Sequence, residues 1–469
     1  MRQDPERAGW RLLLKWEWLP TLGILLGGVL LQSMNVLMLT TVLPSIVGEL
    51  GGVAMLSWPT TAFLASSIVA ASCAGILAAA VGPRATYCAG VTIFGLGALF
   101  CSLATTMGWV VVGRLVQGFG GGLESAAAYV AVRATFPEAV WSRTIALMST
   151  SWSMSVLLGP LVGGLFARFG NWRGAFVATA IVAGILAVSA SVILPPRTPE
   201  RRTRAAGMPA GRVALISLAI AGMSSASIAE SSFAKAGLIV FAIGALVTML
   251  RLDRVAAAPL LPRDAFSLST PTGMGLWLAL LLCVTFSPLQ IYVPMFLQHL
   301  RGLDPLAAGF MVASGSLGWT IASLATAGAS GSWPDRLMLA GPVMMGIGLT
   351  ALAALLPGSA ATLALVPAII VLGMGIGQCW PFVAQRIMSS ARAHDEVVAA
   401  SSVPTVQQTG FALGAALAGL VANASGFSAG VTEQSMTQVA FWVPASFVMP
   451  AAIAGLASLR LTYLGGPRA

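Results

Sequence analysis

Three polar side chains, Arg114, Gln117 and Glu124, lie inside the apolar run 109–134 and are the residues best suited to chemistry. Ionisable groups are costly at membrane depth, and those that occur there usually face a bundle interior or a cavity and carry a function. At about 100° per residue, Arg114 and Gln117 share a helix face with Gly118, and Glu124 lies at its margin. The opposite face is apolar. The stretch therefore predicts a helix with one side packed on lipid or protein and the other side facing a hydrated space.

The chemistry that suits these groups is proton transfer at Glu124, with Arg114 as its partner. Burial disfavours the charged form of a carboxylate, whereas a nearby arginine favours it. A group balanced between these effects can bind and release a proton, so we interpret the two residues as the proton-coupling pair. Two alternatives stay open: a structural carboxylate paired permanently with an arginine, and a carboxylate that contacts a cationic substrate.

The chain that must position these groups has the composition of a polytopic membrane protein. Of its 469 residues, 57% are hydrophobic and 9% are charged, which no soluble globular protein of this size shows. A membrane span needs roughly 20 apolar residues. Fourteen spans are predicted, at residues 19–48, 58–81, 86–107, 109–134, 143–167, 172–195, 212–229, 234–250, 272–297, 304–328, 337–356, 361–388, 398–422 and 438–460. The two near 212–250 are the weakest, and without them the count is twelve.

The arginines predict the orientation of these spans. Four cations fall in the predicted outer loops, Arg168, Arg173, Lys235 and Arg301, and the inner loops hold many more. Cytoplasmic loops carry an excess of Lys and Arg. We therefore expect a multi-pass protein of the bacterial inner membrane with both termini in the cytoplasm. The net charge of +10 is thereby explained by topology, without nucleic acid as a partner.

Polar segments divide the predicted spans into three parts. We expect an N-terminal six-span bundle over 1–195, a cytoplasmic linker with two inserted spans over 196–271, and a C-terminal six-span bundle over 272–469. The stretch from Pro195 to Arg212 is rich in proline and arginine and forms the linker.

Two motifs give this plan a family resemblance. Arg-Leu-Val-Gln-Gly-Phe-Gly at 114–120 resembles the fourth-helix motif R-x-x-Q-G-x-G of the major facilitator superfamily. Gly-Pro-Leu-Val-Gly-Gly at 159–164 resembles its fifth-helix antiporter motif, G-P-x-x-G-G. Over about residues 15–460 the chain resembles the fourteen-span drug:proton antiporter branch. The resemblance implies an all-α major facilitator fold, with two six-helix bundles and two additional helices between them.

The first-helix motif departs from the family pattern at its acid. Residues 34–44 resemble L-D-x-T-x-x-x-x-A-L-P, but Asn35 stands in place of the aspartate. An amide cannot carry a proton. Asn35 can still orient a substrate or pair with Arg114, and it can equally be a buried amide satisfied by a neighbouring helix.

Two segments resemble the family's inner-loop motif, G-x-x-x-D-R. The first contains Gly75, Gly82 and Arg84 but has alanine at the acid position, and the second contains Asp335 and Arg336. In the family this loop is thought to latch the two halves by charge pairing. We expect such a latch through Arg84 or through Asp335 and Arg336, with a solvated loop pair of little energetic weight as the alternative.

The antiporter motif places a proline inside a helix. Pro160 removes one backbone hydrogen bond and bends the span, while Gly159 and Gly163 let a neighbouring helix approach closely. Together with Gly118 and Gly164, these residues suggest a bendable, leak-tight seam. A static kink and tight helix packing are the alternatives.

Polar and aromatic side chains within other spans suggest a substrate cavity. The candidates are Asn35, Gln117, Trp152, Gln290, Tyr292, Trp319, Trp380 and Gln407. Aromatic walls with a few hydrogen-bonding groups suit bulky amphipathic molecules, although tryptophan in membranes more often serves packing.

The sequence shows no nucleotide-binding loop, catalytic triad or metal cluster, and its five cysteines lack disulfide or zinc spacing. We therefore expect no enzyme and no cofactor beyond a proton gradient. The family resemblance implies a monomeric, lipid-embedded secondary-active exporter that moves lipophilic or cationic small molecules out of the cell in exchange for protons, by alternating access. A lipid or glycolipid exporter of the same fold, and a uniporter or receptor without proton coupling, remain alternatives.

Overall fold

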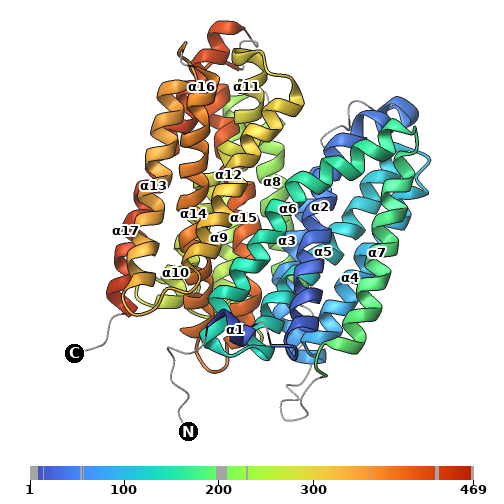
Figure 1. Ribbon diagram of the computed structural model, residues 1–469, viewed down its shortest axis with the longest axis vertical. Coiled ribbons are helices and arrows are strands. Elements are labelled where there is room, and N and C mark those ends of the chain that lie inside the picture. The colour runs from blue at the N-terminus through green and yellow to red at the C-terminus, as the bar shows by residue number, and fades with distance from the viewer. Residues whose placement is uncertain are drawn as a thin grey trace. The chain divides into compact units, whose positions relative to one another are not determined.

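The computed structural model describes residues 9–13, 15–52, 55, 58–196, 209–228, 231–359, 361–427 and 432–465, and within them every regular element is a helix (Figure 1). The predicted linker arginines from 197 to 204 and both chain ends lie outside the described residues. The helices group into two compact units. The first unit comprises Trp10–Arg263 with Ala391–Thr405, and the second comprises Asp264–Ser390 with the chain from Val406 onward.

The first unit contains the elements that correspond to the first eight predicted spans. Their bounds are α1 Trp10–Leu13, α2 Leu19–Leu50, α3 Trp58–Val81, α4 Pro83–Ser102, α5 Met107–Thr135, the short 3-10 helix η3 Glu138–Val140, α6 Trp141–Arg168, α7 Trp172–Ile193, α8 Ala210–Ile228 and α9 Ser232–Arg254. Local capping fixes two of these starts. The Thr106 side chain accepts from the Trp109 amide at the start of α5, and the Asn171 side chain accepts from the Gly174 amide at the start of α7.

The remaining helices carry the last six predicted spans. They are α10 Pro271–Ile291, α11 Val293–Arg301, α12 Pro305–Thr326, α13 Trp333–Leu355, η4 Thr362–Ala364, α14 Leu365–Ser389, α15 Glu396–Ala424, α16 Glu433–Ser446 and α17 Val448–Gly465. The first ten residues of α15 group with the first unit. Two predicted spans are broken, at Tyr292 and at Phe447. Pro294 and Pro450 lack the amide hydrogen that a continuous helix would need there.

Twelve helices or consecutive helix pairs of the described residues are long and apolar enough to cross a membrane. Neither α5 nor α8 is among them. The 29-residue α5 is diluted by its glycines and by Arg114, Gln117 and Glu124, and the apolar stretch of α8 is short, Ala210–Ala219. Fourteen spans therefore remain a prediction, whereas the all-helical, multi-pass architecture is established.

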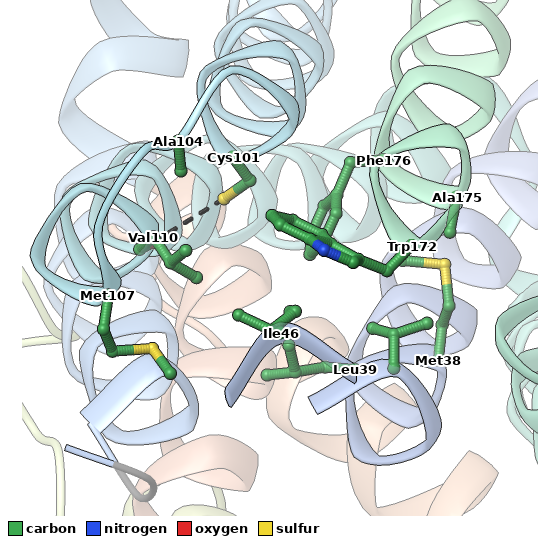
Figure 2. Packing of buried hydrophobic residues seen from close by; sticks show 11 residues of the cluster. Met38, Leu39, Ile46, Cys101, Ala104, Met107, Val110, Trp172, Ala175 and Phe176 are labelled. Atoms are coloured by element: carbon green, nitrogen blue, oxygen red, sulfur yellow. Dashed lines mark hydrogen bonds between the residues drawn. The ribbon is translucent and has the colours of Figure 1, made fainter. Parts of the chain in front are cut away.

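A buried apolar cluster brings four helices of the first unit together, as Figure 2 shows. Met38 of α2, Cys101 of α4 and Val110 of α5 pack with Trp172 and Phe176 of α7. The two aromatic rings meet edge to face at 6.1 Å. Because Arg114 follows Val110 by one helical turn, this cluster fixes the depth at which the first polar side chain of α5 lies.

Candidate functional site

Glycines on two sides of α5 allow the close packing that buries its polar residues. A Cβ on Gly118 would collide with the Phe63 carbonyl oxygen of α3, and a Cβ on Gly120 would collide with the Phe94 amide of α4. Only glycine permits such backbone approaches. The packing interpretation of Gly118 thus has a structural basis, and it does not depend on gating.

The guanidinium of Arg114 is the centre of one polar group, the Arg114 cluster, formed with Asn35 and Gln117. Its Nη1 donates to Asn35 Oδ1 and, at 2.7 Å, to Gln117 Oε1. Its Nε donates to the Pro59 carbonyl oxygen at 3.3 Å. The guanidinium carbon also lies 4.2 Å from the centroid of the Phe63 ring, a cation–π contact. All three side chains of the cluster have no exposed surface.

The Arg114 cluster has hydrogen-bond donors left over. Arg114 Nη2, Asn35 Nδ2 and Gln117 Nε2 are buried without a partner among the described residues. A guanidinium can only donate, so it turns both amide oxygens toward itself and leaves both amide NH₂ groups pointing elsewhere. No carboxylate of the described residues lies within ion-pair distance of Arg114, although four other ion pairs form.

Glu124 has the opposite surroundings. Its side chain is 3% exposed, and neither carboxyl oxygen has a hydrogen-bond partner among the described residues. A Cβ on Gly28 of α2 would overlap both Glu124 Oε1 and the Tyr87 hydroxyl, so these two oxygens lie side by side. The Tyr87 hydroxyl donates its single proton to the Ile24 carbonyl at 2.7 Å. It therefore offers Glu124 an oxygen that can accept a hydrogen bond from the neutral carboxyl group.

A small cavity opens at Glu124 between four helices of the first unit. Its volume is about 10 Å³, close to the space that one water molecule needs, and it is lined by Gly28, Leu31, Gln32, Val91, Phe94, Glu124 and Leu186. The residues come from α2, α4, α5 and α7. The carboxyl group and the Gln32 amide supply polar partners of the kind that a bound water needs.

The expected pairing of Arg114 with Glu124 is not formed. The two residues are ten positions apart on α5, which corresponds to about 15 Å along the helix axis and about 80° around it. A shared helix face describes rotation about the axis only, and the rise along the axis keeps the two side chains apart. Arg114 pairs with Asn35 instead, one of the two roles open to that amide.

The antiporter motif packs α6 against α2. A Cβ on Gly159 would lie 2.7 Å from Leu37 Cβ, and one on Gly163 would collide with the Thr41 hydroxyl. A Cβ on Gly164 would meet nothing within 4 Å. The helix runs through Pro160 as one element, so two of the three glycines form a tight seam.

The inner-loop residues lie at helix ends. Gly75 packs against Val398 and Ser401 of α15, Gly82 has a φ of 94° at the start of α4, and Arg84 lies half-buried in the first turn of α4. A positive φ of this size requires glycine.

In the second unit, Asp335 forms an ion pair with Arg386 of α14 at 2.6 Å. Arg336 stacks on Trp333, with its guanidinium carbon 5.5 Å from the ring centroid. The ion pair joins α13 to α14 within the second unit, whereas the Arg336–Trp333 contact lies within α13 itself.

One charge pair was missed by the sequence reasoning. Arg133 at the end of α5 and Glu396 at the start of α15 form an ion pair at 3.0 Å within the first unit. Both residues lie at predicted inner ends of spans. Because the chain has only 15 acidic residues, an acid at such a position was the available signal of an ion pair.

The proposed cavity residues of the second unit are partly brought together. Trp319 packs against Trp380 at 6.2 Å and against Phe286 at 5.3 Å between ring centroids. The Trp319 indole N–H has no partner among the described residues. Tyr292 lies at the break between α10 and α11. Of the others, Gln290 is exposed and Gln407 on α15 is half-buried. Trp152 is also half-buried, but it lies on α6 of the first unit.

Comparisons with known proteins agree with this architecture. The family model described as the Major Facilitator Superfamily matches residues 25–408. A protein of Mycobacterium tuberculosis named as a probable multidrug-efflux transporter is 33% identical over 433 residues, covering 89% of this chain and 90% of that protein. The multidrug transporter protein MdtP of Bacillus subtilis is 25% identical over 396 residues, covering 82% of this chain and 71% of that protein.

Solved structures show the same fold at low identity. The human organic anion transporter MFSD10 matches with a TM-score of 0.71 and 11% identity, over 97% of this chain and 100% of that chain. The proton:xylose symporter XylE matches with a TM-score of 0.66 and 14% identity, over 93% and 94% of the two chains.

Proposed function

The chain belongs to the major facilitator superfamily, and from this premise we propose that it exports lipophilic small molecules in exchange for protons. It is a multi-pass membrane transporter, not an enzyme, and its relatives include proteins named as multidrug transporters. Alternating access of two helical halves is the mechanism that this fold supports. The proposal assigns the proton to Glu124.

The unpartnered, buried carboxyl of Glu124 is the observation that carries this proposal. With no cation in ion-pair contact and no hydrogen bond to its oxygens among the described residues, the charged form is costly in this position. The neutral form can donate to the Tyr87 oxygen, whose own proton is engaged at Ile24. Hydration of the Glu124 cavity would favour release of the proton. A carboxyl group that is neutral when its cavity excludes water and ionised when the cavity is hydrated couples proton transfer to the alternating access of the transporter.

We extend the proposal to the topology. Because α5 packs along α3 and α4, and α8 packs against α9, we place both across the membrane, which gives fourteen spans. Both termini and the linker would then face the cytoplasm. A cysteine introduced at Thr203 should react with an impermeant maleimide from the cytoplasmic side only, and reaction only from outside would reverse the orientation.

The functional test uses proteoliposomes that accumulate a lipophilic dye with and without an inside-acid gradient. The gradient should stimulate uptake by the wild-type protein, because lumenal protons would leave as the dye enters. Glu124→Gln keeps the shape of the side chain but fixes its neutral state, so the stimulation should disappear. Glu124→Asp should retain part of it.

The matched control is Glu433→Gln, which makes the same change at an exposed residue in the first turn of α16. This variant should respond to the gradient as the wild type does. Dye uptake by the wild type that ignores the gradient would show a uniporter and reject the exchange mechanism.

A further inference from the structure

The Arg114 cluster contains a buried positive charge with no negative partner in the described structure. The family pattern would provide an acid at position 35, but this chain has Asn35. The groups that contact the guanidinium are two amide oxygens, the Pro59 carbonyl and the Phe63 ring, all of them neutral.

The other acids of α2 to α7 do not supply the missing charge. Glu49 is engaged with Arg173 at 2.6 Å and with the Trp172 indole at 2.7 Å. Glu124 lies ten residues further along α5. An unpaired buried charge is strongly unfavourable unless something compensates it.

The unused hydrogen-bonding capacity of the cluster consists entirely of donors. One guanidinium NH₂ and two amide NH₂ groups are buried and unpartnered. They belong to side chains that all converge on one guanidinium nitrogen, from α2 and from α5. The amides cannot turn to offer oxygen instead, because Arg114 holds both oxygens. A bound water would accept some of these hydrogen bonds but would leave the charge uncompensated.

We propose that the Arg114 cluster binds an anionic group, either a carboxylate of the exported molecule or a chloride ion. Such a group accepts charge-assisted hydrogen bonds from the free donors and supplies the charge that Asn35 lacks. The assignment of a substrate carboxylate rests on the proposed export function, whereas an anion site as such does not. A substrate carboxylate at this site shifts the expected substrates from lipophilic cations toward lipophilic acids and zwitterions.

The test is a binding experiment with two dyes that differ in one charge. Rhodamine B has a free carboxylate, and rhodamine B methyl ester does not. Binding to the purified full chain in lipid nanodiscs is followed by fluorescence polarisation in chloride-free sulfate buffer. The wild type should bind rhodamine B about tenfold more tightly than the ester, the ratio that one charge-assisted contact typically gives.

Asn35→Asp supplies the missing carboxylate within the protein and barely changes the side-chain shape. It should weaken rhodamine B binding by about tenfold and so abolish the preference for rhodamine B over the ester, because Arg114 is then already paired. Asn171→Asp is the matched control. It adds the same charge at the cap of α7, where aspartate also caps well, and it should leave the preference intact.

Added chloride distinguishes the two sources of the anion. If the substrate carboxylate occupies the cluster, chloride should compete with rhodamine B only. If chloride is the occupant, it should strengthen binding of the ester to the wild type and not to Asn35→Asp. Equal binding of both dyes by the wild type in either salt, unchanged by Asn35→Asp, would overturn the anion site.

The binding test is independent of proton coupling. A preference for the carboxylate dye in a protein that shows no gradient-driven transport would reject the proposed function and keep the anion site. Gradient-driven transport without any anion preference would reject the site alone.

Discussion

The two buried polar groups of α5 lie on one helix but have opposite needs. The Arg114 cluster has three unpartnered donors and a positive charge. Glu124 has two unpartnered oxygens and a small cavity. Each is incomplete in a way that the other could correct, yet the helical rise keeps them apart. Two polar residues on neighbouring faces of one helix therefore need not pair, and each group keeps hydrogen-bonding capacity that a partner from outside the protein could satisfy.

Removal of the Arg114 guanidinium should have the largest effect on export. Arg114→Ala leaves two amide oxygens and the Pro59 carbonyl without their donor and removes the only charge of the cluster. We expect dye export in proteoliposomes to fall to background with the protein still inserted. Arg114→Lys should retain about a tenth of the activity, because an ammonium cannot bond both amides in the geometry of a guanidinium fork. Arg460→Ala, at an exposed arginine, is the control, and full activity of Arg114→Ala would reduce the cluster to packing.

A substitution that disturbs only Glu124 should cause a smaller loss of export than Arg114→Ala. In Gly28→Ala the new methyl group overlaps Glu124 Oε1 and the Tyr87 hydroxyl and must displace the carboxyl. We expect net export to fall by about tenfold, since overpacking of this kind costs roughly 1–3 kcal/mol. Gly27→Ala is a matched control, because its nearest contact would be an ordinary 3.5 Å to Leu186. Rhodamine B binding should be unchanged in both variants, and equal export by the two would show that Glu124 tolerates displacement.

Removal of the Tyr87 hydroxyl beside Glu124 tests whether Glu124 is the group that carries the proton. Tyr87→Phe deletes the oxygen that can accept from the neutral carboxyl and removes the side-chain hydrogen bond to the Ile24 carbonyl. We expect a loss of about threefold in gradient-driven export, in line with one hydrogen bond of about 1 kcal/mol. Anion preference should not change. Wild-type export by Tyr87→Phe at every gradient would remove Tyr87 from the proton path.

The smallest effect should come from the ion pair outside both polar groups. Arg133 and Glu396 are partly exposed, with 19% and 37% of their side-chain surface accessible. Such pairs typically contribute about 0–1 kcal/mol and weaken with salt. Arg133→Gln should therefore change export by less than about twofold. A loss as large as that of Arg114→Ala would make this pair a functional latch.

Most of the helices could be predicted from the sequence. A membrane span must hydrogen-bond its backbone N–H and C=O groups internally and surround them with apolar side chains. Runs of about 20 apolar residues therefore indicate helices directly. The breaks at Tyr292 and Phe447 were missed, although Pro294 and Pro450 were visible signals. A proline can also lie within a continuous helix, as Pro160 does in α6, so sequence alone does not distinguish the two cases.

The candidate site could be predicted only in part. Helical periodicity placed Arg114 and Gln117 together, and the family motif brought Asn35 to them. The partners of Glu124 could not be found in this way, because Gly28 and Tyr87 reach it from other helices. The one available signal was a tyrosine within an apolar span, since a buried tyrosine hydroxyl usually needs a partner.

The most direct test of the central claim compares net export with equilibrium exchange in Glu124→Gln. Exchange of labelled for unlabelled dye across the proteoliposome membrane needs no net proton transfer, whereas gradient-driven accumulation does. If Glu124 carries the proton, the variant should exchange dye within about twofold of the wild-type rate and show no response to an inside-acid gradient. Loss of exchange together with accumulation would make Glu124 structural, and an intact gradient response would place the proton on another group.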